Sequence, residues 1–101
     1  MDKITWRHGR NACQEYYDAR IGDDYLCVFA NKWNPDVWMG MVNCLMIHNK
    51  TRNDRQRRRQ GLPRSASVFE LQSDWILSGT PEYMMKKVER CWRSGKTEIS
   101  E

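Results

Sequence analysis

The chain has 101 residues, of which 40% are apolar and 30% are charged, and its formal net charge is +4. This length and composition predict one domain spanning residues 1–101 with a single hydrophobic core. The longest apolar run, at residues 37–48, is too short for a bilayer-spanning helix, and the N-terminal residues contain no apolar core typical of a secretory signal. We therefore expect a cytoplasmic protein without membrane contact.

The four cysteines, Cys13, Cys27, Cys44 and Cys91, are widely spaced and form no C-x-x-C pair. Zinc ligands usually come from closely spaced pairs, so we expect no metal site and no cofactor. Two disulfides would suit a secreted chain, whereas this pattern favours buried free thiols. G-x-S-x-G, P-loop and H-E-x-x-H motifs are missing from the sequence, and we expect a protein that is not an enzyme.

The first third of the chain has the alternation typical of β-strands. Residues 8–11 have the composition of a turn. From residue 16 to 22 apolar and polar residues alternate, which predicts a half-buried strand with Asp18 on its polar face. A turn at residues 22–24 and a run of β-forming residues from 25 to 30 then predict a hairpin.

The apolar run at residues 37–48 fits two structures. In a helix, Asn34 would be the cap and Pro35 would occupy the first turn. In a strand, the run would extend the hairpin to three strands. We favour the strand, because Gly40 weakens a helix interior and a third strand makes the sheet more stable.

The segment at residues 49–65 is rich in arginine and is predicted to be a connecting loop. Between Lys50 and Arg64 there are seven basic residues and one acidic residue, a local charge of +6, so the rest of the chain sums to −2. Charge of one sign at this density repels itself and attracts polyanions.

Two helices are predicted after the basic segment, where the apolar periodicity changes to 3.6 residues. The first, at residues 67–79, opens with an S-x-x-E capping box, and the second runs from Thr80 as cap to Gly95 as stop. Residues 94–101 form a polar tail that we expect to be frayed. The predicted fold class is α+β, with a three- or four-stranded antiparallel sheet packed against two C-terminal helices and one sheet face left open.

The basic segment predicts binding to phosphates. The planar guanidinium of arginine suits phosphate oxygens, and aromatic residues near a sheet can stack on bases, here Trp33, Trp38, Tyr16 and Tyr25. The opposing interpretation is a solvated linker with the aromatic residues in the core. The residues that we assign to binding of a partner or of nucleic acid are Lys50, Arg52, Arg55, Arg57, Arg58, Arg59, Arg64 and Trp33.

Trp33 also indicates a partner of another kind. It lies in a turn at residues 31–35, where burial is not required, beside the open face of the predicted sheet. A tryptophan exposed at such a place would be a hot spot for a protein partner. In the other interpretation, its ring folds back over the edge of the sheet.

Several motifs follow one another in a characteristic order: Tyr17-x-Ala19-x-Ile21-Gly22, an apolar strand at residues 25–29, then Trp33 and Trp38 before residues 39–42. This order resembles the short sheet-plus-helix accessory proteins of phage and prophage genomes, some of which are anti-CRISPR proteins. The resemblance covers residues 16–44 and the late helix. It implies a non-enzymatic inhibitor that occupies a functional surface of a host complex. The net basic charge and the arginine-rich insert depart from it, because many such inhibitors mimic nucleic acid with acidic surfaces.

Two functions from different classes therefore remain open. The first is a protein-binding module, an inhibitor of a host defence or nucleic-acid-processing complex, whose partner is a host protein or a ribonucleoprotein. The second is a protein that binds DNA or RNA directly through residues 50–64. An open sheet face would also permit a homodimer.

Overall fold

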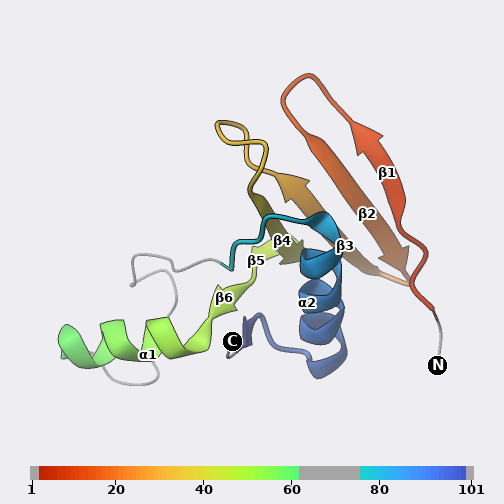
Figure 1. Cartoon of the computed structure of the whole chain (residues 1–101). Helices are drawn as coiled ribbons and strands as arrows, with labels where there is room; N and C mark the ends of the chain where they lie inside the picture. Colours follow the sequence, from red (N-terminus) through yellow and green to blue (C-terminus); the bar gives the residue numbers. More distant parts are fainter. Residues whose placement is uncertain (1–2, 62–75, 100–101) are drawn as a thin grey trace.

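The computed structural model describes residues 3–61 and 76–99. Within them the chain forms a five-stranded antiparallel sheet in the order β1-β2-β3-β4-β5, a two-stranded parallel sheet and two helices (Figure 1). The predicted α+β fold class is confirmed. The elements are β1 (Arg7–Arg10), β2 (Glu15–Ile21), β3 (Asp24–Ala30), β4 (Trp38–Val42), β5 (Leu45–Met46), β6 (His48–Asn49), α1 (Lys50–Arg59), α2 (Pro81–Ser94) and β7 (Glu98–Ile99).

The predicted hairpin is confirmed as β2 and β3. The turn between them contains Gly22, whose φ of 61° is the left-handed value that glycine adopts at little cost. Asp24 then anchors the turn to the rest of the fold, because its carboxylate accepts hydrogen bonds from Trp92 Nε1 at 2.8 Å and from Asn43 Nδ2 at 2.9 Å. The hydrogen bond from Trp92, followed by that from Asn43, lowers the pKa of Asp24.

The apolar run at residues 37–48 contains β4 and β5, so the strand prediction is confirmed and the helix alternative is wrong. Helix α2 crosses β4 so closely that a Cβ atom on Gly40 would lie 2.4 Å from Val88 Cγ2. The glycine therefore marks the place where helix and sheet meet. Asn43 and Cys44, with φ values of 50° and 67°, make the two-residue turn between β4 and β5.

Helix α2 covers one face of the sheet, as predicted for the second C-terminal helix (Figure 1). Thr80 is the N-cap, and its Oγ1 accepts a hydrogen bond from the Tyr83 N–H at 3.4 Å. Gly95 ends the helix with a φ of 71°. The largest fully buried side chains between the two layers are Leu26, Val28, Ile47, Ile76, Met84, Val88 and Cys91.

The turn predicted at residues 8–11 is wrong, because most of that segment belongs to β1. The turn lies further along the chain, at residues 11–14, where Asn11 Oδ1 accepts hydrogen bonds from two backbone N–H groups at 2.8 and 2.9 Å. The segment is a strand because β2 offers it a partner: the His8 ring stacks on that of Tyr17 at a centroid distance of 4.6 Å.

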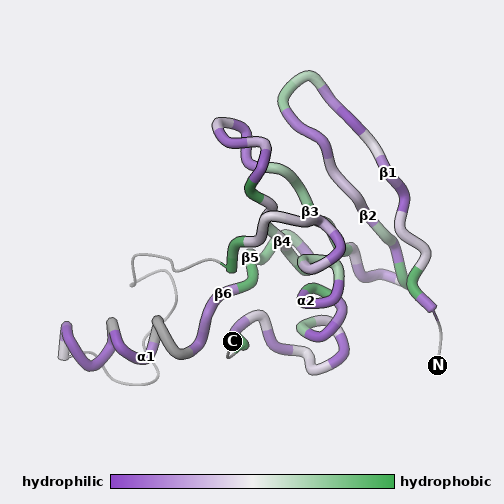
Figure 2. Tube along the Cα trace, viewed as in Figure 1, coloured by the Kyte–Doolittle hydropathy of each residue, from purple (hydrophilic) through white to green (hydrophobic). Residues whose placement is uncertain are grey.

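The loop predicted at residues 49–65 is also wrong over most of its length, since Lys50–Arg59 forms helix α1. Its sequence, KTRNDRQRRR, contains no apolar residue. Figure 2 shows the contrast with the body of the protein, where the hydrophobic stretches lie in the strands and in α2. Helical periodicity was therefore not visible in this segment.

The polar tail predicted at residues 94–101 is not frayed in its described part. β7 pairs in parallel with β6, so that His48 lies beside Glu98 and Asn49 beside Ile99. Ile99 is only 7% exposed and joins the hydrophobic core. The partner strand lies about fifty residues earlier in the chain, which is why the pairing was not evident from the tail itself.

Most of the first predicted C-terminal helix, at residues 67–79, lies outside the described residues. Its final residues are described, and they are extended rather than helical. The N–H of Ile76 donates to the carbonyl of Ile47 at 3.2 Å, and Ser78 exchanges two backbone hydrogen bonds with Trp38 at 2.7 and 3.1 Å. The prediction is therefore wrong at this end, because the chain is drawn into backbone pairing with β4.

Candidate nucleic-acid interface

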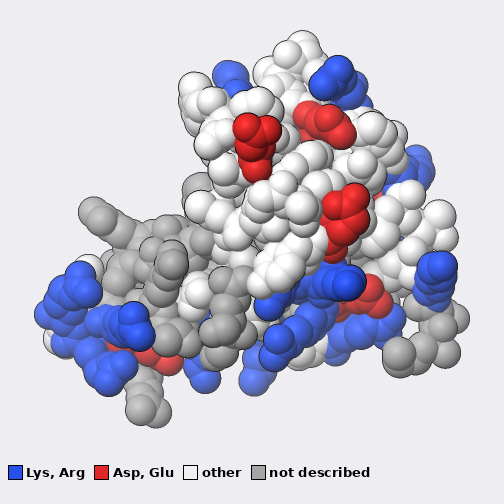
Figure 3. All heavy atoms as spheres, in the orientation of Figure 1, with Lys and Arg blue, Asp and Glu red and all other residues white. Residues whose placement is uncertain are grey.

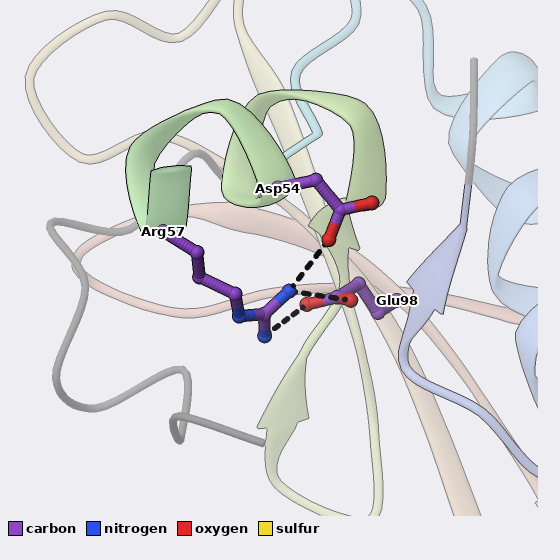
Figure 4. A network of polar contacts seen from close by, with 3 residues as sticks. All are labelled: Asp54, Arg57 and Glu98. Atoms are coloured by element: carbon purple, nitrogen blue, oxygen red, sulfur yellow. Dashed lines mark hydrogen bonds and ion pairs between the residues drawn. The ribbon is translucent and has the colours of Figure 1, made fainter. Parts of the chain in front are cut away.

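Helix α1 is attached to the fold by a buried arginine. The side chain of Arg57 is 9% exposed, and its Nη1 donates to Asp54 Oδ1 at 2.9 Å. Its Nη1 and Nη2 also donate to both carboxylate oxygens of Glu98 on β7, at 3.4 and 3.3 Å (Figure 4). The hydrogen bond with Glu98 raises the pKa of Arg57, so its guanidinium is charged at any ordinary pH. A helix without apolar residues thus gains a fixed position.

This position changes the role of one predicted binding residue. Arg57 faces inward and is engaged with two carboxylates of the same chain, so it is a structural residue and the prediction that it contacts a partner is not supported by its geometry. The side chain of Arg52 and the whole of Arg64 lie outside the described part of the chain. The predicted cations that α1 exposes to solvent are Lys50, Arg55, Arg58 and Arg59.

A groove of about 490 Å³ adjoins the start of α1. Its cations are Lys50 from α1, Arg90 from α2 and Lys96 from the segment between α2 and β7. One carboxylate, that of Glu98, also lines the groove, and Arg57 holds it. Sequence reasoning missed Arg90 and Lys96 as site residues, although Arg90 was on the polar side of the predicted late helix and Lys96 was in the polar tail.

Many of the positive side chains lie in the lower part of the molecule as drawn in Figure 3, over α1 and over the lower part of α2, while others lie at its top and right edge. This lower part combines the exposed cations of α1 with those of the groove, although they come from segments far apart in the sequence. Because solvent-exposed cations on neighbouring elements act on the same region of solvent, their potentials add.

Trp33 is the second predicted site, and it is 85% exposed. It lies in the loop between β3 and β4, where Asn31 Oδ1 accepts hydrogen bonds from the N–H groups of Trp33 at 2.8 Å and Asn34 at 3.1 Å. The Lys32 ammonium lies 5.6 Å from the centroid of the ring. The interpretation in which the ring folds back over the sheet edge is therefore wrong. Figure 1 places this loop well away from α1, so the predicted site residues form two separate places.

The aromatic residues predicted to stack on bases are also divided by the fold. Trp38 is 7% exposed and belongs to the core beneath α2, so it cannot form a platform. Tyr16 and Tyr25 lie together on the opposite face of the sheet, with Phe29, which the sequence reasoning did not select. The predicted hairpin could have identified Phe29, because a register centred on its turn pairs Phe29 with Tyr16 across β2 and β3.

Comparison with protein-family models, with curated proteins and with solved structures finds no match for this chain. Residues 3–61 and 76–99 contain no group of three or more His, Cys, Asp or Glu side chains that could hold a metal ion. In the same ranges, no helix has the length and apolar character needed to cross a membrane. The function must therefore be argued from the surfaces themselves.

Proposed function

We propose that α1 and the adjoining groove bind the phosphate backbone of a nucleic acid. The observation that supports this most directly is that α1 is held in place by one buried arginine, while four other cations among its described side chains project into solvent. These four are Lys50, Arg55, Arg58 and Arg59.

The physical argument is one of cost. A short helix without apolar residues buries little surface that would stabilise it, and its exposed cations repel one another. A bound polyanion attracts these cations and so offsets their mutual repulsion. Binding also releases the counterions that had condensed on the polyanion. Phosphates spaced along a strand suit cations spaced along a helix and a groove. Arg90 and Lys96 extend the surface beyond α1.

Replacement of Arg55, Arg58 and Arg59 together by Gln is the test. Gln keeps a high helix propensity, so α1 should persist while three charges are lost. We expect the slope of log K against log salt to become shallower by about 2 to 3, since each phosphate contributes about 0.7 for a single strand and 0.9 for a duplex. Fluorescence anisotropy with labelled single-stranded and duplex oligonucleotides measures the slope.

The matched control removes three exposed cations elsewhere, by replacing Lys3, Arg10 and Lys32 with Gln. It changes the net charge equally but leaves α1 intact. We expect it to retain most of the salt slope. If the two triple variants lower the slope equally, only net charge matters and the proposed interface is wrong.

A second function is favoured by the exposure of Trp33. We propose, as the alternative, that its loop binds a protein partner, as expected for an inhibitor of the phage accessory type. The Trp33 ring is 85% exposed, so a large apolar surface is in unfavourable contact with water. A bound protein partner would remove that contact. Capture experiments should then yield a host protein or ribonucleoprotein that the Trp33→Ala variant loses and the α1 triple variant keeps. A protein lost from both variants, or from neither, would contradict this alternative.

A further inference from the structure

The sheet face opposite α2 contains a cleft of about 310 Å³. Tyr16 on β2 and Phe29 on β3 are direct cross-strand partners and both line it. Asp18 and Tyr25 lie further along the same two strands and line it as well. The cleft thus joins aromatic rings with hydrogen-bonding groups, on a surface that neither proposed site uses.

Gly9 explains why the cleft is open. It pairs with Tyr16 across β1 and β2, and a Cβ atom built on it would lie 2.4 Å from Tyr16 Cζ and 2.5 Å from the hydroxyl oxygen. The far end of the Tyr16 ring therefore lies directly over Gly9, toward β1 and away from Phe29 on β3. Because glycine has no side chain there, the Tyr16 ring has room to turn toward β1.

The polar part of the cleft is built around Asp18. This residue was expected on a solvent-facing side of the strand, yet it is only 8% exposed. Its Oδ2 accepts a hydrogen bond from the Tyr25 hydroxyl at 2.9 Å, and its Oδ1 accepts one from Arg7 Nε at 3.3 Å. Each carboxylate oxygen has two lone pairs, so the group retains capacity to accept from a ligand.

The rim of this face is cationic. Arg7 is largely exposed beside Asp18, and the Arg20 guanidinium lies over the ring of Tyr25, 5.2 Å from its centroid. A planar ligand with N–H donors and an attached phosphate would meet aromatic walls, a carboxylate acceptor and nearby cations. Nucleobases with exocyclic amino groups have this chemistry, and only an unpaired strand leaves their faces and edges accessible.

We propose that this cleft takes an unstacked base of a single-stranded nucleic acid, with the base between Tyr16 and Phe29 and its amino group donating to Asp18. The inference rests on the proposed nucleic-acid binding and gives it a substrate class, because a duplex cannot offer a base to the cleft. Base stacking on an aromatic side chain corresponds to roughly a tenfold gain in affinity or more.

The experiment compares a short oligocytidylate with an abasic strand of equal length, for the wild type and the Gly9→Ala variant. The alanine Cβ must displace the end of the Tyr16 ring, which is the flexible end of a side chain, so the cleft is disturbed while no lining group is removed. Gly79→Ala is the matched control, since nothing lies within 4 Å of a Cβ atom there. Free cytidine monophosphate is tested in parallel.

We expect the wild type to bind oligocytidylate at least about tenfold more tightly than the abasic strand. Gly9→Ala should remove most of this preference, whereas Gly79→Ala should retain it. The α1 triple variant should weaken both strands by a similar factor, because it acts on phosphates. If the wild type binds oligocytidylate more tightly than its duplex and more tightly than the free nucleotide, the cleft recognises a base that is part of a single strand.

Three results would overturn the inference. Equal binding of the two strands by the wild type would leave phosphate binding intact but remove the base cleft. A preference that survives in Gly9→Ala would place base recognition elsewhere. Stronger binding of free cytidine monophosphate than of the strand would make the cleft a nucleotide site. Failure of the proposed function itself looks different, because then neither strand binds.

Discussion

Replacement of Arg57 by Ala should loosen helix α1, whereas replacement of its neighbour Arg58 should not. Both changes remove one positive charge from the same helix and introduce the same residue. Arg57 is buried and bonded to Asp54 and Glu98, while Arg58 is exposed. The pair of variants therefore separates attachment of the helix from its charge.

The magnitude follows from the burial of the three partners. Loss of one member of a fully buried ion pair costs about 3–5 kcal/mol. Here the side chains of Glu98 and Asp54 are 22% and 40% exposed, so water can solvate them once Arg57 is gone. We therefore expect a loss of about 2 kcal/mol, which at 1.4 kcal/mol per factor of ten is roughly a 30-fold change in the opening equilibrium.

Amide hydrogen exchange measures this opening directly, because it reports local stability. In the Arg57→Ala variant, the amides of residues 54–59 should exchange about 30-fold faster, and in Arg58→Ala they should change by about twofold or less. In a Glu98→Gln background the effect of Arg57→Ala should shrink, since its main partner is already weakened. Equal acceleration in the two single variants would refute the structural role of Arg57.

Three further outcomes are expected. Gly40→Ala should lower the free energy of unfolding by about 1–3 kcal/mol, measured with urea, because its Cβ atom would lie 2.4 Å from Val88 Cγ2. Burial lowers the pKa of His48 below its usual 6.5, against an opposing effect of Glu98, so stability should fall as the pH drops below about 6.5. His48→Gln should reduce that dependence. In the native protein a thiol reagent should modify the exposed cysteines rapidly and the buried ones only after unfolding. The exposed pair is Cys13 and Cys44, and the buried pair is Cys27 and Cys91, whose thiols have pKa values raised by burial to about 11.

Each of these has its own control. Gly79→Ala introduces the same methyl group where nothing is close, and a loss equal to that of Gly40→Ala would point to backbone effects instead of overpacking. For His48, the control is the pH dependence of the His48→Gln variant. If its unfolding free energy falls as much as that of the wild type when the pH is lowered, the loss of stability comes from other groups. Rapid modification of all the cysteines in the native protein would contradict the burial of Cys27 and Cys91.

Local features were the ones that could be predicted. The hairpin of β2 and β3 follows from alternation and a glycine turn, and α2 follows from a Thr-Pro start, an apolar stripe and a glycine stop. Gly40 also helped to predict the strand β4, although the prediction used only part of what this glycine does. The glycine does disfavour a helix, but in the fold it admits Val88 of α2.

The cysteines show the limit of composition. Free thiols were expected to be buried, which holds for Cys27 and Cys91 but not for Cys13 and Cys44. Cys44 occupies a two-residue turn and Cys13 a loop, positions that expose side chains. The surroundings of a residue, more than its type, decided burial.

By itself, the sequence determined the α+β class, the central hairpin, the last helix and the concentration of positive charge, because each of these depends on residues that are neighbours in the chain. Only the tertiary structure decided that the arginine-rich segment is a helix, that Arg57 is its anchor and that Trp33 stands exposed. These depend on pairing between β6 and β7 and on the packing of loops. Partners far apart in the sequence leave no local pattern. An arginine that binds a carboxylate of its own chain therefore looks the same in the sequence as one that is free to bind a phosphate.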